Sequence, residues 1–293
     1  MKVEFFISGR IIDNILDVST KFNPIDNAPE FVLKPLDYLI GFIRQKKPED
    51  VESFVDGLMQ IYDVKVKSDY FAEKGIELQP LLIEYKNIVY HPDLSRLALN
   101  YYIQVLKVSK EKDWYSDVDI VWRGFHYAIL HPHYYNLQTL IEVMGREEAV
   151  KLWKMFVTNY RIDNRSPPEP PFVELKTLYE ERRKEKEDGS WKVIHTMLAD
   201  GKYAYLNVNC TWMRALEDLP DDEIKYYICC YGDYEDARNF HNNIILTMEH
   251  TLAQGDRYCS RVMHDTRVDY DLQHPPIEFW DELYLLKDAE SNE

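Results

Sequence analysis

The chain has 293 residues, of which 45% are hydrophobic and 29% charged, and its formal net charge is −16. This composition is typical of a globular protein with a sizeable core in one or two domains, and the negative charge disfavours sequence-independent binding to nucleic acid. No apolar run approaches the roughly 20 residues that span a bilayer, and the N-terminal stretch lacks the pattern of a signal peptide. We therefore expect a cytoplasmic protein with no membrane partner.

The first part of the chain shows helical periodicity. The proline-rich stretch NRSPPEPPFVE (164–174) cannot continue a helix and predicts a boundary. We therefore expect a helical region at 1–163 and an α+β region at 164–293, together forming one compact unit. Before the boundary, four stretches repeat apolar residues at helical spacing: 31–45, 48–63, 91–107 and 136–160, the last broken near Gly145.

After a highly charged stretch (174–189), which we expect to be a surface helix, the period changes to the alternation that is typical of strands. WKVIHTMLADGKYAYLNVN (191–209) predicts a hairpin around Asp200-Gly201, with Ala199 facing Lys202. That register gives one apolar face, which carries Val193, His195, Met197, Ala204, Leu206 and Cys210, and a second face, which carries Tyr203, Tyr205 and Asn207.

TWMRALEDL (211–219) predicts a helix with Thr211 as its N-cap, whereas the pattern at 221–240 does not distinguish strand from helix. NNIILTMEHTLAQGDRYCSRVMHD (242–265) predicts a second hairpin, with Gly255 at the first central position of a type II′ turn. In that register His250 faces Arg261 and lies diagonal to Cys259, within reach of an imidazole. We therefore expect an α+β fold, with the helical N-terminal half packed on an antiparallel sheet built from hairpins.

All four cysteines lie in the last third of the chain, and we interpret them as reduced thiols. Cys210 ends a strand and precedes a helix, where backbone N–H groups favour a thiolate, so it is a candidate nucleophile. Cys259 is either a partner of His250 or a small buried hydrophobe, and His195 is either a base or a core residue. Separated cysteines can also converge on zinc, but the CxxD stretch of Cys230 lacks a second close pair of ligands, and we expect no metal and no cofactor.

The order NCTWMRALEDL, ICCYGDY and MEHTLAQGDRYC resembles the L-2-amino-thiazoline-4-carboxylic acid hydrolase family, over about residues 136–265. The sequence departs from the family pattern in YCSRV, where an acidic residue and an aromatic residue are expected after the cysteine. The positions that match the family's motifs are Cys210, Cys230 with Asp233, and Thr251, Gly255 and Cys259.

The resemblance implies hydrolytic ring opening at the C=N carbon of a cyclic amidine or thioimidate, a C–N hydrolase chemistry, or a related cyclisation, dehydration or rearrangement. A thiolate adds to that carbon and water releases the product. Asp233 would pair with the substrate's amidinium, and Arg261 or Arg257 with its carboxylate. The catalytic candidates are Cys210, Cys259, Asp233 and His250, and the substrate-binding candidates are Cys230, Arg261, His195 and Thr251.

The competing class is a small-molecule-binding or sensor module, similar to vinyl-reductase-type domains, in which the thiols are inert. In either class we expect a small-molecule partner and no nucleic-acid partner, and the sequence allows a homodimer.

Overall fold

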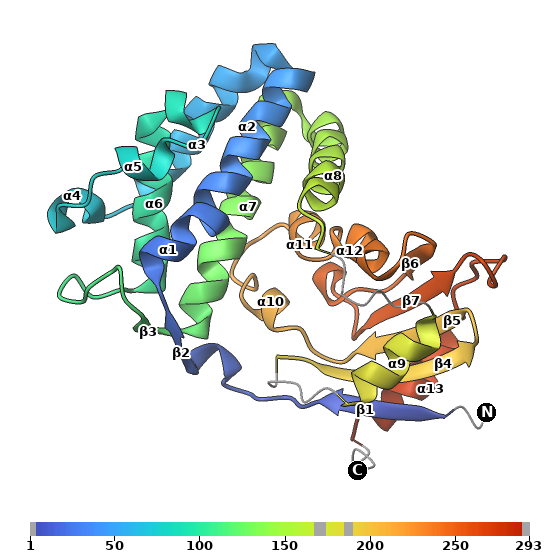
Figure 1. The fold of residues 1–293 in the computed structure, drawn as a ribbon. Helices are drawn as coiled ribbons and strands as arrows, with labels where there is room; N and C mark the ends of the chain where they lie inside the picture. Colours follow the sequence, from blue (N-terminus) through green and yellow to red (C-terminus); the bar gives the residue numbers. More distant parts are fainter. Residues whose placement is uncertain (1–3, 167–173, 185–189, 289–293) are drawn as a thin grey trace. The chain divides into compact units, whose positions relative to one another are not determined.

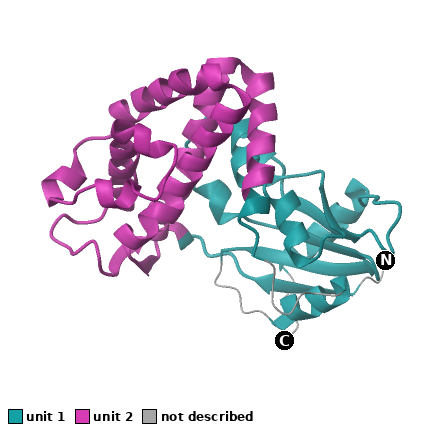
Figure 2. Cartoon of the chain, turned by 45° about the horizontal axis from the view of Figure 1, so that its top comes forward, with its two compact units in different colours: residues 1–15, 161–293 teal, residues 16–160 magenta. Residues whose placement is uncertain are grey.

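The computed structural model describes residues 4–166, 174–184 and 190–288. The predicted α+β class is confirmed, because helices predominate and a five-stranded antiparallel sheet is built mainly from the C-terminal half. The chain forms two compact units, one of residues 16–160 and one of residues 1–15 with 161–293 (Figure 2). The proline-rich boundary falls mostly on residues 167–173, outside the described residues, as do residues 185–189 of the charged stretch. Within the described ranges, no helix is long and apolar enough to cross a membrane.

The unit of residues 16–160 is mainly helical (Figure 1). Its four predicted helical stretches are found, and the predicted break near Gly145 separates two long helices. A short two-stranded sheet accompanies the helices. The elements are β2 (Ser19–Phe22), α1 (Pro24–Ala28), α2 (Lys34–Lys46), α3 (Val51–Lys65), α4 (Tyr70–Lys74), α5 (Gln79–Leu82), α6 (Pro92–Leu106), β3 (Val118–Val121), α7 (Trp122–Met144) and most of α8 (Arg146–Asp163).

The five-stranded sheet forms the centre of the second unit, with the strand order β1-β4-β5-β7-β6 (Figure 1). The two predicted hairpins supply four strands, whereas the N-terminal strand was not predicted, because FFISG does not alternate and a short apolar run does not distinguish strand from helix. That strand pairs with β4 and closes one edge of the sheet. The strands are β1 (Phe5–Gly9), β4 (Lys192–Ala199), β5 (Lys202–Asn207), β6 (Ile244–Met248) and β7 (Cys259–Asp265).

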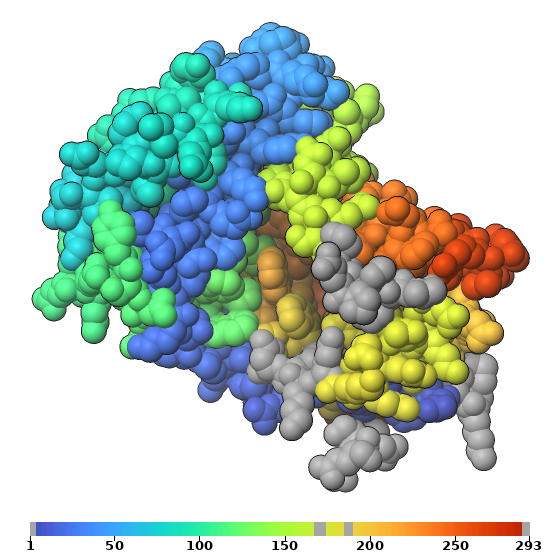
Figure 3. Space-filling model, in the orientation of Figure 1, coloured from blue at the N-terminus to red at the C-terminus, as the bar shows by residue number. Residues whose placement is uncertain are grey.

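Helices cover both faces of this sheet. Helix α9 (Leu175–Lys184) and helix α12 (Asp233–Phe240) pack on one face, and α13 (Ile277–Tyr284) packs on the other through the fully buried Trp280. The outer side of α9 lies on the surface, in yellow in Figure 3, as its charged sequence predicts. Two further helices, α10 (Thr211–Arg214) and α11 (Asp222–Cys229), lead from β5 to α12, which decides the ambiguous stretch 221–240 in favour of helix.

A β-bulge at Leu198 overturns the predicted faces of the first hairpin. Beyond the bulge, His195 pairs with Tyr205. An extra residue in one strand moves the following side chains of that strand to the opposite face relative to its partner. His195 therefore shares a face with Tyr205 and Asn207, and not with Leu206 as the two-residue turn alone would predict.

The second hairpin has a longer turn than predicted. Met248 is paired with Arg261, and residues 249–258 form the connection. Gly255 has φ of +88° and ψ of 8°, a left-handed conformation that favours glycine but does not belong to a type II′ turn. Because the register differs from the prediction by two residues, Cys259 and Arg261 keep the predicted face.

Deletion of Leu198 should destabilise the protein far more than Leu198→Ala. Deletion removes the bulge, so β4 must slip by one residue or lose its pairing with β5, at a cost on the order of 4 kcal/mol in the free energy of unfolding. Leu198→Ala keeps the bulge and removes a half-buried side chain, at about 1 kcal/mol. Urea unfolding followed by circular dichroism measures both values. Equal stabilities would show that the bulge does not set the register.

Candidate functional site

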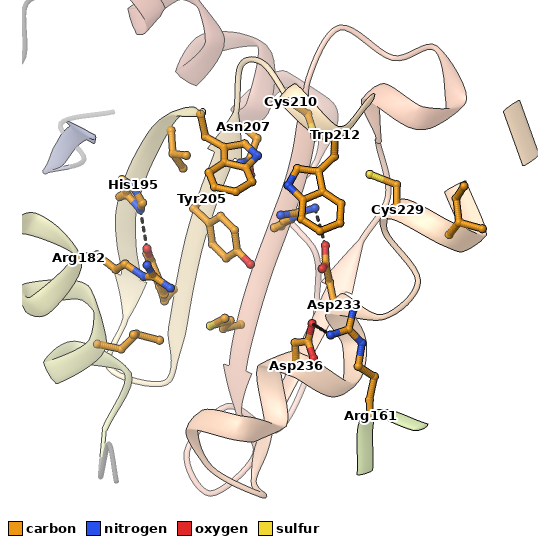
Figure 4. A pocket seen from close by; sticks show the side chains of 17 residues that line it. Arg161, Arg182, His195, Tyr205, Asn207, Cys210, Trp212, Cys229, Asp233 and Asp236 are labelled. Carbon is orange, nitrogen blue, oxygen red and sulfur yellow. Dashed lines mark hydrogen bonds and ion pairs between the residues drawn. The ribbon is translucent and has the colours of Figure 1, made fainter. Parts of the chain in front are cut away.

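A cavity of about 450 Å³ lies in the unit that contains the sheet, on the face covered by α9 and α12 (Figure 4). This volume is in the range of small-molecule pockets. Its wall combines arginines, carboxylates, aromatic rings and two thiols. The polar and aromatic side chains that line it include Arg161, Arg182, Trp191, His195, Tyr205, Asn207, Cys210, Trp212, Cys229, Asp233, Asp236 and Arg261.

One row of cross-strand partners forms the floor of the cavity. His195 on β4 pairs with Tyr205 on β5, and Tyr205 pairs with Arg261 on β7. Phe6 on β1 extends this row, because it pairs with His195 and stacks on its ring with the centroids 4.4 Å apart. The Arg261 guanidinium carbon lies 5.9 Å from the centre of the Tyr205 ring. The bulge at Leu198 aligns His195 with Tyr205 and Arg261.

Two carboxylates of α12 face arginines at the cavity. Asp233 Oδ2 lies 2.6 Å from Arg261 Nη2, and Asp236 Oδ2 lies 3.4 Å from Arg161 Nη1. Burial raises the pKa of Asp236, and the neighbouring Asp233 carboxylate acts in the same direction. Asp233 and Arg261, both predicted as site residues, therefore meet each other in the cavity wall. Asp236 is therefore more basic than an ordinary aspartate.

Cys210 lines the cavity at the N-cap of α10. The predicted N-cap, Thr211, instead donates its hydroxyl to the backbone carbonyl of Ser190 at 2.6 Å. Hydrogen bonding with the Cys229 thiol is the largest effect on Cys210 and lowers its pKa to about 7. The Met213 amide and the Arg261 guanidinium act in the same direction. The Cys229 thiol has the largest effect on the pKa of Cys210. The sequence instead indicated the N-terminus of the following helix, but α10 has only four residues.

Cys230 and Cys259 lie outside the set of described residues that line the cavity. Each is 2% exposed, and burial raises the pKa of Cys259 to about 12. The sulfur of Cys259 accepts a hydrogen bond from the Leu252 N–H at 3.3 Å. In the described part of the chain, no group of three or more histidine, cysteine or acidic side chains is arranged to hold a metal ion. Cys230 and Cys259 are therefore both buried, which agrees with the alternative that Cys259 is a small core residue.

His250 lies in the connection of the second hairpin beside Ser260, whose N–H donates to the His250 carbonyl at 3.0 Å. His250 Nδ1 lies 3.6 Å from Asp256 Oδ1, and its ring meets the Tyr258 ring edge-on. Thr251 is buried in the same connection, where its hydroxyl donates to the Gln254 side chain at 2.9 Å. Neither His250 nor Thr251 is among the described cavity-lining residues.

His195 lines the cavity but is held as a neutral core residue. Its Nε2 lies 2.6 Å from the Ser8 hydroxyl oxygen, and its Nδ1 lies 2.5 Å from the Tyr203 hydroxyl oxygen. Burial, with the nearby Arg182 guanidinium, lowers its pKa to about 3. With both ring nitrogens engaged and so low a pKa, this imidazole is a poor proton acceptor near neutral pH.

The sequence did not predict several residues of the cavity wall. The sequence indicated Cys230 and not its neighbour Cys229. On a helix, adjacent side chains point about 100° apart, so the two cysteines face different surroundings. Tyr205 was placed on the wrong face by the unrecognised bulge. The charged stretch 174–189 gave no signal that Arg182 would point into a cavity.

The fold and the cavity define an α+β protein with a pocket of small-molecule size whose wall holds two thiols. Residues 122–262 match the family model of L-2-amino-thiazoline-4-carboxylic acid hydrolase, which confirms the resemblance over that stretch. The match includes Cys210, Cys229, Asp233 and Arg261. No curated protein and no solved structure matches the chain.

Iodoacetamide should alkylate Cys210 of the native protein at a rate that rises with pH and is half-maximal near pH 7, because the thiolate is the reactive form. Cys229→Ala removes the contact that most lowers the pKa, so the midpoint should move toward the value of a free cysteine, about 8.5. Cys230→Ala is the matched control and should leave the midpoint in place. Mass spectrometry of the tryptic peptide 203–214 measures the rate, and an unshifted midpoint in Cys229→Ala would contradict the assignment.

The buried neutral His195 should make the protein less stable in acid. Its pKa is about 3 when folded and about 6.5 when unfolded, so the unfolded chain binds more protons between these values and stability is lost as pH falls through this window. Between about pH 7 and about pH 5, His195 should lower the free energy of unfolding by roughly 2 kcal/mol. The measurement is urea unfolding of wild type and His195→Phe at both pH values. An equal loss in the two proteins would exclude this role of His195.

Proposed function

We propose that the cavity is the active site of a cysteine-dependent enzyme that opens a ring at a C=N carbon of a small amino-acid-derived substrate, with L-2-amino-thiazoline-4-carboxylate as the first candidate. The observation that carries the proposal is the Cys210 thiol, which lines the cavity and has its pKa lowered to about 7. A thiol with that pKa is a substantial fraction thiolate at neutral pH. The match to the hydrolase family supports the reaction class.

In the proposed reaction the Cys210 thiolate adds to the C=N carbon, and the electron pair of the C=N bond moves to nitrogen. A bond from that carbon to a ring heteroatom then breaks, and the heteroatom leaves with a proton. Water attacks the resulting covalent adduct, the carbon–sulfur bond to Cys210 breaks, and the thiolate returns. The net change is the addition of one water, split into two easier steps.

The charged groups of the wall suit the two ends of such a substrate. An amidinium can hydrogen-bond to the Asp233 carboxylate, whose side chain is 29% exposed. A carboxylate can bind Arg182, or Arg261 beside Asp233. Arg257, the other predicted carboxylate partner, instead pairs with Asp281 at 2.6 Å and is not among the described cavity-lining residues.

Asp236 is the proposed proton acceptor for the attacking water. Its raised pKa makes it a stronger base than an ordinary aspartate, and it lies one helical turn from Asp233 on α12. His195 is neutral, with both ring nitrogens engaged, and His250 lies next to Asp256. Carboxylate chemistry therefore replaces the imidazole base that the sequence suggested.

The low pKa of Cys210 favours an enzyme over a binding or sensor module, since a module that only holds its ligand needs no thiolate. The same site would serve a related cyclisation, dehydration or rearrangement, because each begins with attack at the same kind of carbon. The four free thiols support a reducing, cytoplasmic location.

Cys210→Ser should lower turnover of L-2-amino-thiazoline-4-carboxylate by orders of magnitude, because the hydroxyl cannot supply the thiolate. The melting temperature should stay within a few degrees, since the change is nearly isosteric. Product is detected by mass spectrometry as substrate plus one water, and binding by calorimetry.

Cys259→Ser is the control and should retain turnover, since that thiol is buried away from the cavity wall. Near-normal turnover in Cys210→Ser would exclude the covalent mechanism. A loss confined to Cys259→Ser would reverse the two roles. A wild-type protein that binds the compound, leaves it intact and has unreactive thiols would instead be the binding module.

A further inference from the structure

Two of the four thiols lie together in the cavity wall. Cys210 precedes α10 and Cys229 is the last residue of α11, and both are at the end of the cavity marked by Trp212 (Figure 4). Helix α10, which follows Cys210, contacts helix α11, which ends at Cys229. Both are partly exposed, whereas Cys230 and Cys259 are buried. A reagent that enters the cavity therefore meets this pair first.

We propose that Cys210 and Cys229 form a redox-active pair, in which a small hydroperoxide that enters the cavity oxidises Cys210 and Cys229 resolves the product as a reversible disulfide. The proposal does not require the hydrolysis proposed above, because it depends only on the placement of the two thiols. If Cys210 is also the nucleophile of that reaction, the disulfide blocks it.

The first step is attack of the Cys210 thiolate on the outer oxygen of the hydroperoxide. The sulfur–oxygen bond forms, the O–O bond breaks, and the sulfur is oxidised by two electrons to a sulfenic acid. The alkoxide or hydroxide that leaves takes a proton from water. Cys210 is the thiol that reacts, since its pKa is lowered to about 7, and the Arg261 guanidinium favours negative charge near it.

The second step joins the two cysteines. The Cys229 sulfur attacks the sulfenic sulfur of Cys210, the S–S bond forms, and the S–O bond breaks. The departing hydroxide takes the Cys229 proton and leaves as water. The sum is two thiols plus one hydroperoxide, giving one disulfide, one alcohol or water from the hydroperoxide, and one further water. A low-pKa accessible thiol beside a resolving thiol is the arrangement that favours this outcome over further oxidation.

The chain allows a direct test, because trypsin separates the thiols. Cleavage after Lys202, Arg214, Lys225 and Arg238 places Cys210 in peptide 203–214 and Cys229 with Cys230 in peptide 226–238. Full-length native protein is treated with a slight excess of hydrogen peroxide or cumene hydroperoxide, the remaining thiols are blocked, and the protein is digested without reductant. We expect loss of two of the four thiols, a cross-link between these two peptides, and full recovery of the thiols with dithiothreitol.

Matched variants at the adjacent positions 229 and 230 identify the resolving cysteine. Cys230→Ser should keep the cross-link, whereas Cys229→Ser should lose it and leave a sulfenic acid on Cys210 that dimedone traps. No loss of thiols, irreversible oxidation of Cys210 in the wild type, or a cross-link that needs Cys230 would each overturn the proposal. If Cys229→Ser does not fold, the cross-linked peptides of the wild type and of Cys230→Ser still show whether Cys229 is the resolving cysteine. Because every readout here is the state of the thiols and none is turnover, failure of this proposal is distinguishable from failure of the hydrolysis.

Discussion

The pocket depends on a single alignment across the sheet, in which Phe6, His195, Tyr205 and Arg261 occupy one cross-strand row. Each member fixes the next: the Phe6 ring stacks on the imidazole, and the guanidinium lies near the phenol ring. The extra residue in β4, Leu198, keeps the row in phase. Without it the imidazole would point into the opposite, apolar layer, and a polar group buried without partners is costly. The floor of the cavity therefore depends on the register of the strands more than on any one side chain.

Arg261 links the chemistry of the pocket to this alignment. The guanidinium pairs with Asp233 at 2.6 Å and also lowers the pKa of Cys210. A mostly buried cation is tolerated only when opposite charge or hydrogen bonds compensate for lost hydration, and here a carboxylate and a thiolate share that role. Because one cation lies near both groups, the proposed binding of a substrate at Asp233 would change the field at the thiol. The proposed function would therefore couple substrate recognition and nucleophile activation through this one residue.

The fold class and both hairpins could be predicted from the sequence, because alternation, Asp200-Gly201 and Gly255 are local signals. The site could be predicted only in part. Cys210, Asp233 and Arg261 were found, but the contact of Cys210 with Cys229 joins separate elements and leaves no local pattern. Tyr205 was misplaced because a bulge depends on packing that a two-residue turn does not reveal. The register of the second hairpin differs from the prediction by two residues, because its turn is longer than its glycine suggested.

The edge strand β1 has a consequence for the order in which the protein is made. Ser8 and His195 are 187 residues apart in sequence, although their side chains lie in contact. At a synthesis rate of roughly 5–20 residues per second, β1 leaves the ribosome about 10–40 seconds before its partner strand. All of residues 16–160 emerge in that interval. The nascent chain must therefore carry an apolar strand with unpaired backbone groups, a segment on which chaperones can act, until β4 arrives.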